Sequence, residues 1–202
     1  PAPNALVIDQ LTAIAARRDI PVVMIFTKPD LADPTPWAEI YRKAGYPTAV
    51  VNNRTGEGLE AAAELLKGGI TAFCGNSGAG KSSLMNGLYP ELNLATGEIS
   101  KKLGRGRHTT RHVELFEVEG GGKVFDTPGF TSFEIMEAGE DNLRLYYPEI
   151  ERYEGQCRYD NCRHITEPNC AVREAVKNGE IPKQRYESYA ANIEEIRGRK
   201  KY

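Results

Sequence analysis

Eight residues near the middle of the chain, Gly75 to Ser82, have the spacing GxxxxGK[ST]. The three glycines of GNSGAGKS allow backbone conformations that a side chain would forbid, so that successive N–H groups can converge on phosphate oxygens. Lys81 is placed to reach the β- and γ-phosphates, and the Ser82 hydroxyl to ligate Mg²⁺. An incidental glycine-rich turn is the alternative. The predicted contact residues are Gly75, Asn76, Ser77, Gly78, Ala79, Gly80, Lys81, Ser82 and Ser83.

A second group of residues in the C-terminal third has metal-ligand spacing. Three cysteines and one histidine fall within 14 residues and supply the ligands of a closed tetrahedral Zn²⁺ site. Disulfides are disfavoured in a cytosolic protein, so metal is preferred over pairing, with unconnected thiols as the alternative. Four protein ligands indicate a structural site that holds a loop-rich segment together. We predict one zinc ion per chain, bound by Cys157, Cys162, His164 and Cys170.

The elements that must position these residues alternate between helix and strand. Apolar runs typical of buried strands occupy 21–26, 48–51 and 70–74, with Cys74 expected in the core. Helical spacing occurs at 6–18, 37–43, 58–67 and 83–88. This alternation predicts an α/β fold, a mostly parallel sheet with helices on both faces.

After about residue 128 the strand pattern fades, and the rest of the chain favours helices around the cysteine-bearing loop. Helices are predicted at 168–178 and 182–197. We therefore expect two domains, an α/β domain over 1–139 and a small helical zinc-binding domain over 140–202.

Two polar loops follow predicted strands, at the edge where open α/β sheets bind ligands. The base-recognition loop, Thr27-Lys28-Pro29-Asp30, is close to the NKxD pattern. The carboxylate of Asp30 can accept hydrogen bonds from the N1–H and exocyclic amine of guanine, a donor pair that adenine lacks. Lys28 can lay its alkyl stem over the base. Thr27 offers a single hydroxyl where asparagine, with a bidentate amide, is usual.

The second base loop, residues 52–58 (NNRTGEG), resembles the SAKxGxG loop that supports guanine from its other edge. Asparagines stand where serine and alanine are usual, so backbone N–H contacts survive while side-chain contacts differ. A plain strand-to-helix turn is the alternative. The two loops place Thr27, Lys28, Pro29, Asp30, Asn52, Asn53 and Arg54 at the guanine.

Downstream of the phosphate loop, a strand runs into Asp126-Thr127-Pro128-Gly129, a DxxG sequence. Asp126 would hold Mg²⁺ through a water, and the Gly129 N–H would meet the γ-phosphate. The basic, glycine-rich segment 104–111 lies between and is expected to act as a switch. Within it, Thr110 is the first choice as a Mg²⁺ ligand while the γ-phosphate is present, and Thr109 the alternative.

Hydrolysis requires a group that orients the attacking water, together with the charge of Lys81 and the Mg²⁺ held by Thr110. Phe130 stands where many GTPases have glutamine after DxxG, and a hydrophobic side chain cannot do this. His108, beside the switch threonines, is the predicted substitute. An exposed histidine that contacts RNA, or nothing, is the alternative.

In the order TKPD, NNRTGEG, GNSGAGKSS, GRHTT and DTPG, these motifs resemble a circularly permuted GTPase domain. With the Cys/His spacing, the chain is similar over nearly all its length to the ribosome small-subunit-dependent GTPase family, often called RsgA. The resemblance implies hydrolysis of GTP to GDP and phosphate, stimulated by the small ribosomal subunit and its rRNA, in late maturation of that subunit. It also supports a catalytic histidine. Family members carry an oligonucleotide-binding barrel before the GTPase domain, so we expect this chain to be a fragment that lacks it.

Composition is that of a soluble protein: 202 residues, 40% hydrophobic and 27% charged, with a formal net charge of −2. No apolar run reaches the roughly 18 residues of a membrane span, and no signal peptide opens the chain. We expect a cytoplasmic monomer with no membrane partner. Basic segments at 101–112 and 197–201 suit RNA phosphates or, alternatively, a solvated face. A ribosome-binding module that uses GTP as a structural switch without hydrolysis, and an ATP-using enzyme, are the competing classes.

Overall fold

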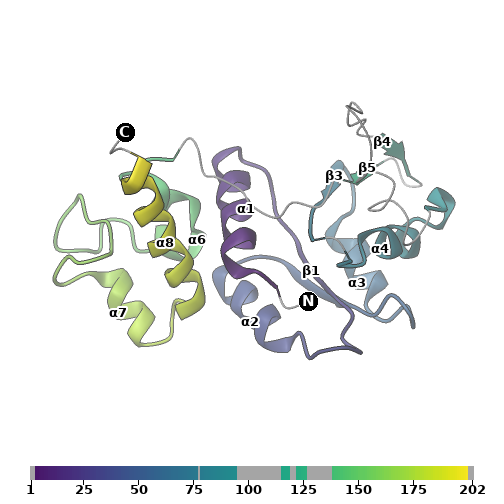
Figure 1. Ribbon diagram of the computed structural model, residues 1–202, viewed down its shortest axis with the longest axis horizontal. Helices are drawn as coiled ribbons and strands as arrows, with labels where there is room; N and C mark the ends of the chain where they lie inside the picture. The colour runs from purple at the N-terminus through teal and green to yellow at the C-terminus, as the bar shows by residue number, and fades with distance from the viewer. Residues whose placement is uncertain (1–2, 77, 95–114, 119–121, 127–137, 200–202) are drawn as a thin grey trace. The chain divides into compact units, whose positions relative to one another are not determined.

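The computed structural model describes residues 3–76, 78–94, 115–118, 122–126 and 138–199, and these fall into two compact units (Figure 1). Unit 1 comprises Pro1–Val22, Glu39–Pro47 and Ser132–Tyr202. Unit 2 comprises Val23–Ala38 and Thr48–Thr131. The division at 139/140 that we expect from the sequence stays a prediction about domains. The first 22 residues cluster with the C-terminal region rather than with the strands.

Unit 2 contains all of the described strands. β1 (Met24–Thr27) and β2 (Thr48–Val51) pair in parallel, with Met24 opposite Thr48. β3 (Ile70–Phe73) runs parallel to β5 (Lys123–Asp126), and β4 (Leu115–Glu117) pairs with β5 in the antiparallel sense. The expected mostly parallel pairing is confirmed, and within the described residues it is distributed over two sheets.

Helices α3 (Leu59–Leu65) and α4 (Lys81–Leu88) and the short η1 (Pro90–Leu92) complete unit 2. α4 buries neighbouring apolar residues, Leu84 and Met85, against the core of this unit. The buried apolar residues of that core come from both sheets and both helices: Ala49, Val51, Ala62, Phe73, Leu84, Met85, Val118 and Val124.

The strand before the phosphate loop differs from expectation. We predicted a buried strand over 70–74 with Cys74 in the core, but Ile70 is 69% exposed, Cys74 is exposed, and only Phe73 of β3 is buried. Among the described strands β3 has a single hydrogen-bonded neighbour, β5, and its residues before Phe73 are not buried, so most of this strand does not reach the core. The core position predicted for Cys74 is therefore wrong.

Unit 1 is helical. It contains α1 (Ala5–Arg17), η2 (Leu143–Tyr146), α6 (Pro148–Glu151), α7 (Ala171–Lys177) and α8 (Lys183–Arg199). α1 packs against α8 and η2, so the first and last helices of the chain lie side by side (Figure 1). None of the described helices combines the length and apolar character of a membrane span.

Helix α8 turns a mixed polar and apolar face inward. Its buried residues recur every three or four positions, as one face of an α-helix requires: Arg185, Ser188, Tyr189, Asn192, Ile193 and Ile196. Tyr189 packs edge-on against Tyr147, with ring centroids 5.4 Å apart. This face belongs to the same core that encloses Cys162 and Cys170.

Helix α2 (Thr35–Ala44) begins five residues after Asp30, the last residue of the base-recognition loop. The Asp33 carboxylate accepts a hydrogen bond from the Thr35 N–H (2.9 Å), a side-chain cap of the kind that starts helices. Residues of α2 before Glu39 belong to unit 2, and those from Glu39 onward belong to unit 1.

Candidate functional site: a nucleotide site and a metal cluster

The phosphate loop, residues 75–82, connects β3 to α4 in unit 2. Gly80 caps α4 with φ = 92°, a left-handed conformation that favours glycine. Lys81 opens the helix, and its Nζ donates to the carbonyls of Gly75 (2.9 Å) and Asn76 (3.3 Å). The lysine ammonium is therefore folded over the loop that precedes it, and Ser82 lies half-buried in the first turn of α4. This is the strand, loop and helix context that the motif requires.

Side chains of both base loops donate hydrogen bonds to this phosphate loop. Three consecutive loop carbonyls each accept a hydrogen bond, two from the base-recognition loop and one from the second base loop. The pairs are Lys28 Nζ with Gly78 O (2.6 Å), Thr27 Oγ1 with Ala79 O (2.5 Å) and Asn53 Nδ2 with Gly80 O (3.2 Å). The sequence motifs predicted for base and for phosphate thus lie together in one site.

The two base loops also contact each other. Arg54 Nη1 lies 3.3 Å from Asp30 Oδ2, and the Asp30 side chain is 27% exposed. Asn52 Oδ1 accepts from the Arg54 N–H (3.0 Å), which stabilises the turn after β2. The end of the second base loop lies close to the backbone of β2. Position 58 therefore requires glycine, because a Cβ there would lie 2.0 Å from the carbonyl oxygen of Val50. The charged end of Asp30 therefore faces the second base loop.

In unit 1, the predicted metal ligands form a compact cluster. The candidate ligand atoms of Cys157, Cys162, His164 and Cys170 all lie within 4.8 Å of one another. His164 Nδ1 lies 3.5 Å from Cys157 Sγ and 3.4 Å from Cys170 Sγ, and those two sulfurs are 3.9 Å apart. Nδ1, rather than Nε2, is the histidine atom that faces the sulfurs.

The spacings of three of these ligand atoms fit a tetrahedral zinc ion. Zinc bond lengths of about 2.3 Å to sulfur and about 2.05 Å to nitrogen place tetrahedral ligands about 3.8 Å apart for a sulfur pair and about 3.6 Å apart for sulfur and nitrogen. The three separations among Cys157 Sγ, His164 Nδ1 and Cys170 Sγ agree with these values to within about 0.2 Å, and the Cys162 ligand atom lies within 4.8 Å of each of them. Burial of three of the four ligands leaves little access for a fifth group.

Burial sets the protonation states of the cluster residues in the absence of metal. Burial raises the pKa of the Cys162 thiol to about 12 and also raises the pKa of Cys170. Burial lowers the pKa of His164, which favours the neutral imidazole that a metal needs. A cation bound here would have to displace the thiol protons, so metal binding would release protons.

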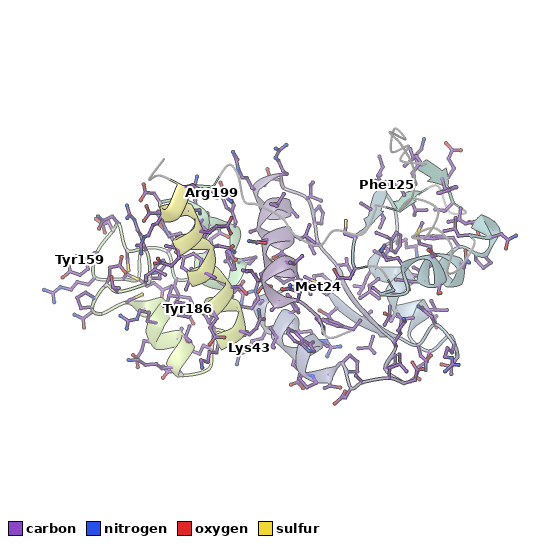
Figure 2. The ribbon with its side chains drawn as sticks, viewed as in Figure 1. Met24, Lys43, Phe125, Tyr159, Tyr186 and Arg199 are labelled. Carbon is purple, nitrogen blue, oxygen red and sulfur yellow. The ribbon has the colours of Figure 1, made fainter. Side chains whose placement is uncertain are left out.

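The loop that carries these ligands is held by polar groups around it. Tyr186 on α8, labelled in Figure 2, donates its hydroxyl proton to the carbonyl of His164 (2.7 Å), and Tyr189 does the same to Arg163 (2.8 Å). The Glu167 carboxylate accepts from the N–H groups of Arg163 (3.0 Å), Ile165 (2.9 Å) and Thr166 (3.0 Å). Burial raises the pKa of Glu167, but these backbone hydrogen bonds outweigh it and leave that pKa below its usual value.

Comparison with known proteins gives the family. The model of the RsgA GTPase family matches residues 1–136. The small ribosomal subunit biogenesis GTPase RsgA of Geobacillus sp. (strain WCH70) is 44% identical over 199 residues, which cover 96% of this chain and 68% of that protein. The chain belongs to the RsgA GTPase family.

Solved structures agree with this family assignment. The crystal structure of YjeQ from Thermotoga maritima superposes with a TM-score of 0.78 at 34% identity, over 98% of this chain and 68% of that one. YloQ, described as a circularly permuted GTPase, has a TM-score of 0.78 at 31% identity, over 100% of this chain and 66% of that one. The permuted GTPase fold expected from the motif order is thus confirmed.

Several residues predicted for catalysis, nucleotide binding or Mg²⁺ binding lie outside the described part of the chain. They are Ser77, His108, Thr109, Thr110 and Gly129. Asp126 ends β5, where it pairs with Phe73 at the end of β3, so its backbone stands beside the start of the phosphate loop. The roles of all these residues in this member of the RsgA GTPase family stay predictions.

Sequence reasoning missed the side chains that organise each site. Asn53 was placed at the guanine, but its hydrogen bond to the phosphate loop was not predicted, and the Glu167 carboxylate and the hydroxyls of Tyr186 and Tyr189 were not assigned. A buried arginine, Arg185, also escaped notice. One signal was available for it: on α8, Arg185 lies four positions before Tyr189 on the face that becomes the core.

Proposed function

We propose that this chain binds GTP with Mg²⁺ and hydrolyses it to GDP and phosphate, stimulated by the small ribosomal subunit, in late maturation of that subunit. The observation that carries the proposal is the bonding of the base-recognition loop to the phosphate loop through Thr27 and Lys28. A single site then combines a triphosphate cradle with an aspartate suited to guanine. The printed names of relatives, small ribosomal subunit biogenesis GTPase RsgA, support the biological role.

Each motif has a proposed part. Backbone N–H groups of residues 75–83 bind the phosphates, Lys81 neutralises β- and γ-phosphate charge, and Ser82 ligates Mg²⁺. Asp30 accepts hydrogen bonds from the guanine edge, while Asn52, Asn53 and Arg54 support its other side. Asp126, Gly129 and Thr110 respond to the γ-phosphate and its metal.

For hydrolysis we assign His108 the task of orienting the attacking water. It stands on the same segment as Thr110, so it is in place only when that segment closes on the γ-phosphate. Turnover is therefore slow in the isolated protein and rises when the ribosomal partner orders the segment. Lys81 supplies the fixed positive charge for the transition state.

The Cys/His cluster is proposed to bind one structural Zn²⁺. Four protein ligands leave no open position for catalysis, so zinc would stabilise the ligand loop against α8. With the basic tail of the chain, this region is suited to contact rRNA phosphates. We place the protein in the cytoplasm as a monomer.

Multiple-turnover phosphate release, with and without purified small subunits, tests the enzymatic proposal. We expect stimulation of at least about tenfold, with large subunits as the control, since a partner that orders catalytic groups can raise GTPase rates far more than this. GTP binding without measurable turnover in both conditions would instead support the ribosome-binding module that uses GTP as a structural switch. Equal rates with GTP and ATP would overturn the assignment of the base-recognition loop.

A further inference from the structure

Two residues that differ from the usual motifs, Thr27 and Asn53, contact the same part of the phosphate loop in unit 2. Position 27 has threonine where asparagine is usual, and position 53 has asparagine where a small residue is usual. In the structure, Thr27 Oγ1 donates to the carbonyl of Ala79 and Asn53 Nδ2 to the carbonyl of Gly80, the next residue of the phosphate loop. The two unusual side chains thus bind adjacent carbonyls.

Those carbonyls need donors for a physical reason. A loop whose N–H groups converge on phosphate must turn its carbonyl groups outward. An outward carbonyl that is partly shielded from water loses free energy unless a protein donor pairs with it. Ala79 and Gly80 are both half-buried. The Gly80 carbonyl already accepts the first helical hydrogen bond of α4, from the Leu84 N–H (2.9 Å), so Asn53 adds a second donor to an oxygen that has two lone pairs.

The space around Gly80 shows that both side chains converge there. A Cβ built on Gly80 would lie 3.1 Å from Asn53 Nδ2 and 3.7 Å from Thr27 Oγ1. The hydroxyl of Thr27 has one proton, which it gives to Ala79, so it cannot also donate to Gly80. An asparagine amide has two N–H protons, and in this chain the nearby amide belongs to Asn53.

The Asn53 side chain is oriented by the phosphate loop rather than by its own loop. Its Oδ1 is buried and has no hydrogen-bond partner among the residues that the structure describes, whereas its Nδ2 bonds to Gly80. By contrast, neighbouring Asn52 uses its Oδ1 within the loop, for the Arg54 N–H. The Asn53 amide therefore makes its hydrogen bond to the phosphate loop and not within the second base loop, so it can position the phosphate loop.

We propose that Asn53 supplies, from the second base loop, the amide that Thr27 lacks, and that it is a positioning residue for the phosphate loop and a determinant of guanine-nucleotide affinity. This inference rests on the proposed function of the site. Asn53 holds the carbonyl of Gly80, the cap of α4, and thereby orients the N–H groups at the start of α4 toward phosphate. In this chain the amide beside Gly80 comes from the second base loop and not from position 27.

The test is a double-mutant cycle on the whole chain, with binding of a fluorescent GDP analogue as readout. Asn53→Ala should weaken GDP binding about tenfold, the effect of removing one hydrogen bond to a half-buried group. Thr27→Asn in the same protein should restore affinity to within about threefold of the original, because the amide returns from the other loop. Thr27→Asn alone should give no gain, since two amides then compete for the space beside Gly80.

Asn86→Ala is the matched control. Asn86 on α4 is also a half-buried asparagine that bonds to a backbone carbonyl, that of Leu94 (2.8 Å), and it does not contact the phosphate loop in the described structure. Asn86 Oδ1 also accepts a hydrogen bond from the Leu94 N–H (2.7 Å), so Asn86→Ala should lower the thermal midpoint at least as much as Asn53→Ala, but only Asn53→Ala should lose GDP affinity. Should Asn53→Ala fail to fold, Asn53→Leu keeps the volume and removes the donor.

Two results would overturn the inference: unchanged GDP affinity in Asn53→Ala, or a double variant no tighter than Asn53→Ala. Failure of the proposed function looks different, because the unmodified protein would then bind no GDP at all. Rescue by Thr27→Asn is the decisive result, since a merely structural asparagine would not be replaced from another loop.

Discussion

Asp9 on α1 and Arg185 on α8 form an ion pair in which both side chains are fully buried, with Arg185 Nη1 2.6 Å from Asp9 Oδ1. The same guanidinium lies 2.5 Å from Glu149 Oε1 on α6. Its carbon also stands 4.8–5.6 Å from the ring centroids of three tyrosines, Tyr41, Tyr46 and Tyr147. Although burial lowers the pKa of Arg185, Glu149 and Asp9 raise it well above its usual value. One cation thus joins three helices of unit 1.

Arg185→Met is expected to destabilise unit 1 by about 3–5 kcal/mol, because it leaves two carboxylates buried without a partner. Urea unfolding followed by tyrosine fluorescence measures this. Lys183→Met on the same helix breaks an exposed pair with Glu187 and should change stability by less than about 0.5 kcal/mol. Adding Asp9→Asn and Glu149→Gln to Arg185→Met should recover part of the loss. Equal effects of the two single variants would contradict a central role for Arg185.

Zinc binding predicts both a metal content and a pattern of thiol reactivity. Protein purified without chelators should contain about one equivalent of zinc, and less than about half would count against the site. At neutral pH an alkylating reagent should modify one thiol per chain, the exposed Cys74, and the three cluster thiols only after chelation. Cys170→Ser should remove the metal, whereas Cys74→Ser should not.

If Asp30 recognises guanine, replacing one oxygen of its carboxylate by an NH₂ group should change the base preference of the site. Asp30→Asn replaces a carboxylate oxygen by an N–H₂ donor, so GTP affinity should fall at least about tenfold while affinity for xanthosine triphosphate rises. Asp33→Asn, three residues later on the same segment, is the control and should leave base preference unchanged. A GTP-over-ATP ratio unaffected by Asp30→Asn would remove Asp30 from the base site.

The catalytic prediction concerns His108. His108→Ala should abolish most of the turnover stimulated by small subunits, with a reduction of about 10²-fold or more, because a positioned water-orienting group contributes on that scale. Affinity for a non-hydrolysable GTP analogue should stay within about twofold. His112→Ala, one residue beyond the switch segment 104–111, provides the comparison. Unaltered stimulated turnover in His108→Ala would dismiss the assignment.

The side-chain cap of α2 predicts that the Asp33 carboxyl group titrates at a lower pH than usual. Hydrogen bonds from the side chain and then the backbone N–H of Thr35 lower the pKa of Asp33. A depressed carboxyl pKa contributes stability that is present above the unfolded value of about 3.9 and is lost as pH falls through the lower folded value. Carbon-detected NMR should show Asp33 titrating below its ordinary range, and Thr35→Val should move its pKa upward. A pKa at or above the ordinary value would show that the cap does not form in solution.

Motifs that are contiguous along the chain were predictable because their geometry is local. GNSGAGKS needs only its glycines and the following helix to form a phosphate loop, and β3, the loop and α4 occur where expected. The cluster from Cys157 to Cys170 is likewise spanned by a short loop, and its ligand atoms do meet. The order of the motifs was also sufficient to indicate the permuted fold.

Contacts between distant segments were not predictable from spacing. Cys74 was expected in the core because an apolar run does not reveal which of its residues tertiary packing will cover, and in the structure Cys74 is exposed. Asp9, Glu149 and Arg185 look like solvated charges in the sequence, yet the fold buries all three together.

The sequence by itself therefore determined which motifs are present: a phosphate-loop pattern, an aspartate of the kind that reads guanine, and four Cys/His residues with metal-ligand spacing, the GTPase motifs standing in permuted order. Only the tertiary structure decided which side chains hold those groups in place, such as Asn53 on Gly80 and Arg185 between Asp9 and Glu149. The physical reason is that motif chemistry depends on residue type and short-range backbone geometry. A buried donor, in contrast, finds its acceptor only after the chain has folded and water has been excluded.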